Sequence, residues 1–239
     1  MSTTTANTNC ATRMPTAIKY QLRTVICLAF IAGFTDAYGF LNFKTYVSFM
    51  SGNTTQTGYG LAQFNFQGIK LALMAIFSFS TGIFSGTYVS AYQWYKKLWT
   101  PYVIVSLLLL LYMFTIIFFK NIYYSIIYLS FTMGFLNTAL NTIGKQSVNP
   151  DFVTGTLNSL AKHLAYWANK LPLSDVQGAW DTHKSRALQL LYVWFAFLTG
   201  AFMATVSQPL LGLYTLLVPA LMLLVIAYAY SFAVKNTTE

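Results

Sequence analysis

Long stretches without charge are the feature of this sequence that most constrains its fold. The longest covers residues 187–234 and contains no Asp, Glu, Lys or Arg. A helix needs about 20 apolar residues to cross a bilayer core of about 30 Å, so this run is long enough for two crossings. Ser207-Gln208-Pro209 lies near its middle. Because proline cannot continue a helix, we expect a tight hairpin at these residues.

Six apolar segments have the length of a membrane-spanning helix. The composition agrees, because 56% of the residues are hydrophobic and only 8% are charged, against about 25% charged residues in soluble domains. The sequence therefore predicts an all-α membrane protein with six transmembrane helices. The expected spans are residues 25–43, 71–92, 102–119, 122–143, 188–206 and 210–232.

Two further stretches, residues 47–63 and 152–165, are helix-like but too short or too polar for a lipid-facing span. Irregular backbone at membrane depth is tolerated only where it is buried in protein or lines a wet cavity. We therefore expect two short re-entrant, or discontinuous, helices. Ser51 and Thr154 are the expected N-caps, with the helix N-termini directed into the protein interior.

The basic residues indicate an orientation. With the N-terminus in the cytoplasm and six spans, only Lys44, Lys70 and Lys120 of the 14 Lys and Arg residues lie on the outer side. This follows the positive-inside rule and places both termini in the cytoplasm. An eight-span arrangement, in which both short stretches cross, fits nearly as well. The net charge of +9 is thus explained without a nucleic-acid partner.

Local matches in the same order relate the two halves of the chain. The blocks "GFTD" at 33–36, "SGN" at 51–53 and "TGIFSGT" at 81–87 match "GFLN", "TGT" and "TGAFMAT" in the second half. Three crossings per half is an odd number, so the second half would enter from the opposite side, giving two inverted-topology three-span repeats. A duplication kept only for packing is the alternative.

This repeat gives the predicted organisation of the chain. Small residues spaced for close helix approach are expected to pack helices in both halves; they are Gly33, Gly39, Gly82, Gly86, Gly200 and Ala204. The expected segments are a disordered cytoplasmic tail (1–17), a first repeat (18–119) containing the short helix 47–63, and a second repeat (120–235) containing the short helix 152–165 and a cytoplasmic loop (166–187).

Asp36 is the one acidic residue inside an expected span. Acids at membrane depth often mark ion or proton paths, and desolvation favours the protonated form. The alternative is a structural carboxylate, bound to backbone amides of the adjacent short helix or paired with Lys44, Lys162 or His163. The matching residue of the second half, Asn137, carries no charge. The candidate substrate or ion pathway comprises Asp36, Ser51, Gly52, Asn53, Thr54, Thr57, Asn137, Thr154, Gly155, Thr156 and Asn158.

Other chemistries find little support in the sequence. His163 and His183 have no second ligand at a metal spacing, and Cys10 and Cys27 form neither a disulfide framework nor a metal motif. No hydrolase or metalloprotease motif occurs. We therefore expect no enzyme activity, no metal site and no cofactor.

Several motifs resemble one family. "AGFTDAYGFL" at 32–41 and "VSFMSGNTTQTGYGLA" at 47–62, with "GFLNTAL" at 134–140 and "FVTGTLNSLAKHLA" at 152–165, are similar to the YoaK-like family of small bacterial inner-membrane proteins. The resemblance covers nearly the whole chain after the tail. It implies a polytopic protein of the inner membrane and no particular substrate, since this family is a domain of unknown function.

These observations favour a small permease for a polar solute or ion, with Asp36 as the candidate proton coupler. Two alternatives stay open: an uncoupled, channel-like facilitator, and a non-transporting membrane scaffold or accessory protein. The expected partners are membrane lipids, the unidentified solute or ion, and further copies of the chain in a homo-oligomer.

Overall fold

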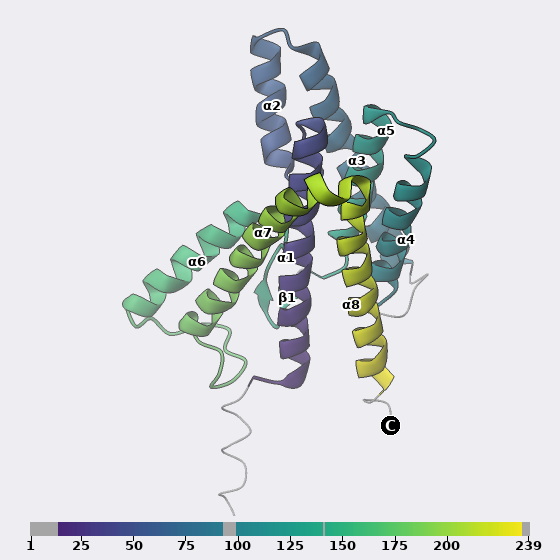
Figure 1. The fold of residues 1–239 in the computed structure, drawn as a ribbon. Coiled ribbons are helices and arrows are strands. Elements are labelled where there is room, and N and C mark those ends of the chain that lie inside the picture. The colour runs from purple at the N-terminus through teal and green to yellow at the C-terminus, as the bar shows by residue number, and fades with distance from the viewer. Residues whose placement is uncertain (1–13, 93–98, 141, 236–239) are drawn as a thin grey trace, which may run out of the picture.

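The computed structural model describes residues 14–92, 99–140 and 142–235, and this part of the chain is nearly all helical (Figure 1). Most of the predicted tail, including Cys10, lies outside the described residues. The elements in order are α1 (Thr16–Phe43), α2 (Met50–Ala62), α3 (Phe66–Ala91), α4 (Thr100–Thr115), α5 (Ile122–Leu136), β1 (Thr142–Ile143), β2 (Gln146–Ser147), α6 (Val153–Ala168), α7 (His183–Leu211), the 3-10 helix η1 (Gly212–Leu216) and α8 (Leu217–Lys235).

Three helical runs are long and apolar enough to cross a membrane: Thr16–Phe43, Phe66–Ala91 and the 49-residue run His183–Ser231. The last run contains α7, η1 and most of α8. Helices α4 and α5 are also apolar, but their 16 and 15 residues are fewer than a full crossing needs. The chain is thus an all-α membrane protein, as expected, while the number of crossings stays a prediction.

The end of α5 differs from expectation. The segment 122–143 was expected to be one span, but the helix ends at Leu136 and a two-stranded hairpin follows, with Thr142 opposite Ser147. Gly144 forms the turn with a φ of 60°, which a glycine adopts without steric cost. Its N–H donates to the side chain of Gln21 on α1 at 2.8 Å, so the hairpin is fixed against α1.

The hairpin between α7 and α8 lies later than expected. Helix α7 continues through Pro209 to Leu211, and the chain turns at Gly212, whose φ is 54°. A proline in the last turn of a helix removes only one hydrogen bond, and Gly212 ends the helix with a positive φ that other residues rarely adopt. The break predicted at 207–209 was therefore wrong in position, although the chain does reverse (Figure 1).

Both short stretches are helices, with bounds that differ from those expected. Helix α2 packs against α3, and α6 packs against α7 (Figure 1). Because α6 extends to Ala168 and α7 already begins at His183, the loop between them is 169–182 rather than 166–187.

Helices α1 and α7 make one of two very close helix contacts. A Cβ atom on Gly33 of α1 would overlap the carbonyl oxygen of Phe197 on α7. Reciprocally, a Cβ atom on Gly200 of α7 would overlap the carbonyl oxygen of Phe30 on α1. Only glycine allows the two backbones to approach in this way, as in other tightly packed membrane helices.

Helices α3 and α5 repeat the same arrangement. Gly82 of α3 lies against the carbonyl oxygen of Phe131, and Gly134 of α5 lies against that of Phe79. All four helices thus carry the same pattern, a phenylalanine followed three residues later by a glycine. The α1–α7 and α3–α5 contacts therefore have the same geometry, with a glycine from each helix against the backbone of the other. Each contact joins a helix of the first half to a helix of the second half.

The remaining helices complete this arrangement. Helix α4 packs against α8, and the hydroxyl of Ser106 donates to the carbonyl of Ala220 at 2.8 Å. The start of α1 and the end of α8 lie at the same end of the molecule, and α1 and α7 both rise from that end while α3 and α5 run the other way (Figure 1). Large apolar side chains such as Phe77, Phe202 and Leu210 are exposed, as expected for a lipid-facing surface.

Candidate functional site

Asp36 lies in the C-terminal half of α1 and is buried, with 3% of the residue exposed. One carboxylate oxygen accepts hydrogen bonds from the backbone N–H groups of Val47 at 2.9 Å and Ser48 at 2.7 Å. The other accepts from the Ser48 hydroxyl at 2.8 Å. These donors belong to the segment that leads into α2, so Asp36 places a negative charge at the positive end of that helix.

This contact shows that α2 is capped from a neighbouring helix. Phe49 is the N-cap residue, and its side chain cannot accept a hydrogen bond. The expected N-cap, Ser51, lies inside the first turn, so that prediction was wrong. The ring of Phe49 instead lies over Gly52, where a Cβ atom would overlap it. The α2 terminus is therefore already occupied by an internal carboxylate.

Helix α6 begins with the same local structure. Phe152 is the N-cap residue, its ring lies over Gly155, and Thr154 is within the helix rather than at its cap. The backbone angles agree as well, with φ −82° and ψ 77° at Phe49 and φ −100° and ψ 75° at Phe152. Gly52 and Gly155, predicted to line a pathway, thus leave room for the aromatic ring at each helix start.

Asn53 and Thr156 are buried at matching positions of the two short helices. The Asn53 side chain accepts a hydrogen bond from the N–H of Tyr46 at 3.1 Å and donates to its carbonyl at 2.8 Å. Thr156 donates to the carbonyl of Phe152 at 3.1 Å. Asn53 therefore fastens the α1–α2 connection to α2.

The other predicted pathway residues lie on outer faces of these helices. Ser51, Thr54, Thr154 and Asn158 are exposed, and Thr57 is half-buried. The hydroxyl of Thr54 donates to a backbone carbonyl of its own helix at 2.8 Å, and that of Thr57 does so at 2.9 Å. The structure thus separates the predicted set into a buried centre and an outer face.

Asp151, which the sequence analysis did not select, lies directly before α6. Together with Asn137 it lines a small cavity of about 20 Å³ whose other walls are apolar side chains of α1, α5 and the α5–α6 connection. Burial raises the pKa of Asp151 to about 7, and the charge of Asp36 contributes to this shift. The two acids, one at the start of each short helix, are thus close enough to act on each other.

The two halves place their acid differently. Thr154 matches Ser51 in the repeat, so three residues earlier Asp151 matches Ser48. In the first half the acid is on the long helix and the hydroxyl is on the connection. In the second half Asn137 caps the C-terminal end of α5, and the connection carries the acid. Extending the matched block three residues toward the N-terminus would have identified Asp151.

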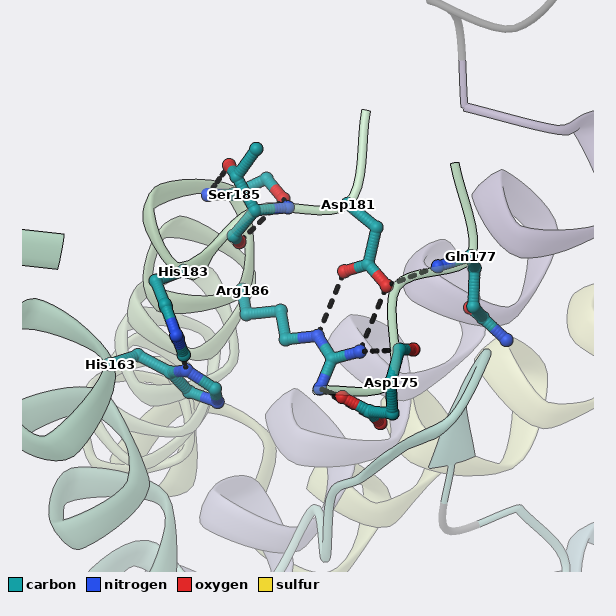
Figure 2. A network of polar contacts seen from close by, with 8 residues as sticks. His163, Asp175, Gln177, Asp181, His183, Ser185 and Arg186 are labelled. Carbon is teal, nitrogen blue, oxygen red and sulfur yellow. Dashed lines mark hydrogen bonds and ion pairs between the residues drawn. The ribbon is translucent and has the colours of Figure 1, made fainter. Parts of the chain in front are cut away.

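A second polar cluster lies where the 169–182 loop meets α7 (Figure 2). The guanidinium of Arg186 donates to the two carboxylate oxygens of Asp181, each at 2.8 Å, and forms an ion pair with Asp175 at 3.0 Å. Burial alone would raise the pKa of Asp181, but the hydrogen bonds from Arg186 and from the N–H of Gln177 outweigh it and lower the pKa. This cluster fixes the loop to the start of α7.

His163 of α6 and His183 of α7 extend this cluster, with a hydrogen bond of 2.8 Å between their Nδ1 atoms (Figure 2). One ring must accept the hydrogen bond and is therefore neutral. Burial, followed by the nearby His183 and Arg186, lowers the pKa of His163. Neither His163 nor a lysine forms an ion pair with Asp36 among the described residues. Within that part of the chain, no three His, Cys, Asp or Glu side chains could together hold a metal ion.

Comparison with known proteins gives one match. The family model described as "Protein of unknown function (DUF1275)" matches residues 24–229. This span contains Asp36, Asp151, both short helices and all four close-packed glycines. No curated protein and no solved structure matches the chain.

Proposed function

We propose that this chain, which belongs to the DUF1275 family of proteins of unknown function, is a small permease for a polar solute or an ion. The match confirms the resemblance to the YoaK-like family, and the proposal places the protein in the bacterial inner membrane with both termini in the cytoplasm. Its partners are then membrane lipids, the transported species and further copies of the chain. Neither enzyme activity, nor a cofactor, nor nucleic acid has a part in it.

One observation carries the proposal: the two short helices, α2 and α6, both start beside an acid, of which Asp36 is buried and Asp151 is half-buried. Asp36 caps α2, and Asp151 directly precedes α6. In membrane proteins, interrupted helices of this kind are stable where they are buried in protein or line a wet path. Many secondary transporters bind substrate or coupling ion between two such helices near the midplane of the bilayer.

The helix contacts support an inverted repeat. In the repeat, α1 corresponds to α5 and α3 corresponds to α7. The contact between α1 and α7 therefore corresponds to the contact between α5 and α3. Likewise, the α2–α3 contact corresponds to the α6–α7 contact, and the α4–α8 contact corresponds to itself. In this proposal α1, α3 and α4 cross in the first half, and α5, α7 and α8 cross in the opposite sense in the second. The common end for the start of α1 and the end of α8 agrees with an even number of crossings (Figure 1).

Cysteine labelling tests the topology. In a chain with Cys10 and Cys27 replaced by serine, single cysteines are placed at Gln63, Lys120 and Asn169, and intact cells are treated with a membrane-impermeant maleimide. Six crossings with re-entrant short helices predict labelling of positions 63 and 120 from outside and protection of 169. If α2 crossed fully, positions 63 and 120 would be protected as well, which would overturn this topology.

Flux measurements test transport. Purified full-length protein is placed in liposomes containing a pH-sensitive dye, and the external solution receives sodium, potassium, acetate, inorganic phosphate or single amino acids in turn. A permease should move at least one of these species faster than protein-free liposomes do. Flux without a proton signal would favour the uncoupled facilitator. If no species moves, although the protein shows the cysteine-labelling pattern expected for six crossings, the result would favour a non-transporting membrane scaffold.

A further inference from the structure

The hydrogen bonds of Asp36 argue against its use as the exchanging proton site. Its two oxygens accept from two backbone N–H groups and one hydroxyl at 2.7 to 2.9 Å, and the N–H of Phe49 approaches at 3.4 Å. Hydrogen bonds donated to a carboxylate favour its charged form. A proton on Asp36 would weaken the acceptor of these backbone N–H groups and force the Ser48 hydroxyl to change its role, so Asp36 serves best as an anchor for α2.

Asp151 has different surroundings. Among the described residues that line its cavity none is basic, and Asn137 is its one polar neighbour there. Among the described residues, only its own backbone N–H acts to stabilise its charged form. Asp36 on α1 is the charged group that acts on it, and that charge is repulsive. Asp151 is half-buried, and a carboxylate held partly out of water without a positive partner is stabilised by taking up a proton.

The size and lining of the cavity restrict its ligand. About 20 Å³ is room for about one water molecule, which excludes an organic solute. The polar side chains in its wall, Asp151 and Asn137, supply too few oxygens for calcium or magnesium, which take about six or more ligands. A proton fits this site, and one hydronium ion, which is about the size of a water molecule, can deliver it.

We propose that Asp151, beside Asn137 at the start of α6, is the proton-binding site of this protein, and that Asp36 is its fixed negative neighbour. The inference deepens the proposed permease and rests on it for its role in coupling. In the binding step a carboxylate oxygen of Asp151 takes a proton from a hydronium ion, an O–H bond forms, and a water molecule is left. The reverse step returns the proton to water and restores the negative charge.

Infrared difference spectroscopy of the purified full-length protein tests the site without needing a substrate. A protonated carboxyl has a C=O stretching band that disappears on ionisation. Wild-type protein should lose such a band as the pH rises through about 7, the pKa that burial gives Asp151. Asp151→Asn should lack this transition. Asp36→Asn should retain it with a lower midpoint, because the repulsive neighbour is gone. Asp175→Asn is the control for an exposed acid and should match wild type.

The outcomes are distinct. A transition that is absent in Asp36→Asn and present in Asp151→Asn would overturn the proposal and assign the proton to Asp36. No transition in wild type, or a midpoint that moves with sodium concentration at fixed ionic strength, would also overturn it. If Asp151→Asn does not fold, Asp151→Glu should keep the band with a displaced midpoint. If the protein shows the infrared transition but no flux, the proposal of a proton site at Asp151 stands and the proposal of a permease is overturned.

Discussion

Ser48 donates two hydrogen bonds to Asp36, one from its backbone N–H at 2.7 Å and one from its hydroxyl at 2.8 Å. The pair joins α1 to the segment that leads into α2, across twelve positions of the chain. It gives a short, largely polar helix a fixed starting point inside the molecule. The strength of this pair can be measured directly.

Asp36→Ala should destabilise the folded protein by about 3 kcal/mol, because it leaves the N–H groups of Val47 and Ser48 buried without an acceptor, at about 1 to 3 kcal/mol each. Ser48→Ala removes only the hydroxyl and should cost about 1.5 kcal/mol. Thermal unfolding of both variants in the same detergent provides the comparison. Equal losses in the two variants would show that the backbone contacts to Asp36 contribute little.

Gly82→Ala should destabilise the α3–α5 contact by about 2 kcal/mol or more, because the new methyl group meets the backbone of Phe131, which cannot move aside as a side chain can. Gly58 on α2 is the matched control, since a Cβ atom there has no neighbour within 4 Å. Gly58→Ala should be neutral or stabilising by up to about 1 kcal/mol. A similar loss of melting temperature in both variants would argue against the close helix approach.

Arg186→Met should cost about 3 to 5 kcal/mol, because it leaves the charge of Asp181 buried with its main partner removed. Asp175→Asn removes the more exposed of the two acids and should cost no more than about 1 kcal/mol. Limited proteolysis of the 169–182 loop provides the second measurement. Arg186→Met should be cut there far faster than wild type, whereas equal cutting rates would mean that the loop is held elsewhere.

The folded protein should lose stability as the pH falls below about 6.5, the ordinary pKa of histidine, through His163. Its pKa is lowered in the folded state, so below that pH the unfolded chain binds more protons and is favoured. His163→Gln should lack this part of the pH dependence. Melting temperatures at pH 7.5 and 5.5 provide the check, and an unchanged difference between the two pH values would assign the effect to other groups.

The sequence predicted the class of the fold well because length and polarity decide which segments can enter a bilayer. Apolar runs such as 71–92 appear as helices close to their expected bounds, and the two polar stretches appear as short helices. Helix ends were less predictable, because they depend on contacts with distant residues. Ser51 has the chemistry of an N-cap, but Asp36 performs that function from another helix.

The candidate site was predicted only in part for a related reason. Asp36 stood out because it interrupts an apolar span, whereas Asp151 lies in a polar connection where an acid is unremarkable on sequence grounds. Its place in a cavity depends on the fold, because residues of α1 and α5 form the other walls of that cavity. Similarly, Asn53 looked like a pathway residue, but the distance to Tyr46 makes it a bridge between two backbone groups.

The four glycines form two helix contacts, and these affect how the chain can be assembled. Both contacts join the first half to the second, so a fragment ending between α4 and α5 would expose its glycine faces without a partner. Such a fragment should not be stable alone, yet two fragments produced separately should find each other through these same surfaces. The two halves therefore pack like the two subunits of a dimer that a single chain connects. The connection between α4 and α5 is the position at which the chain can be divided into two fragments that reassociate.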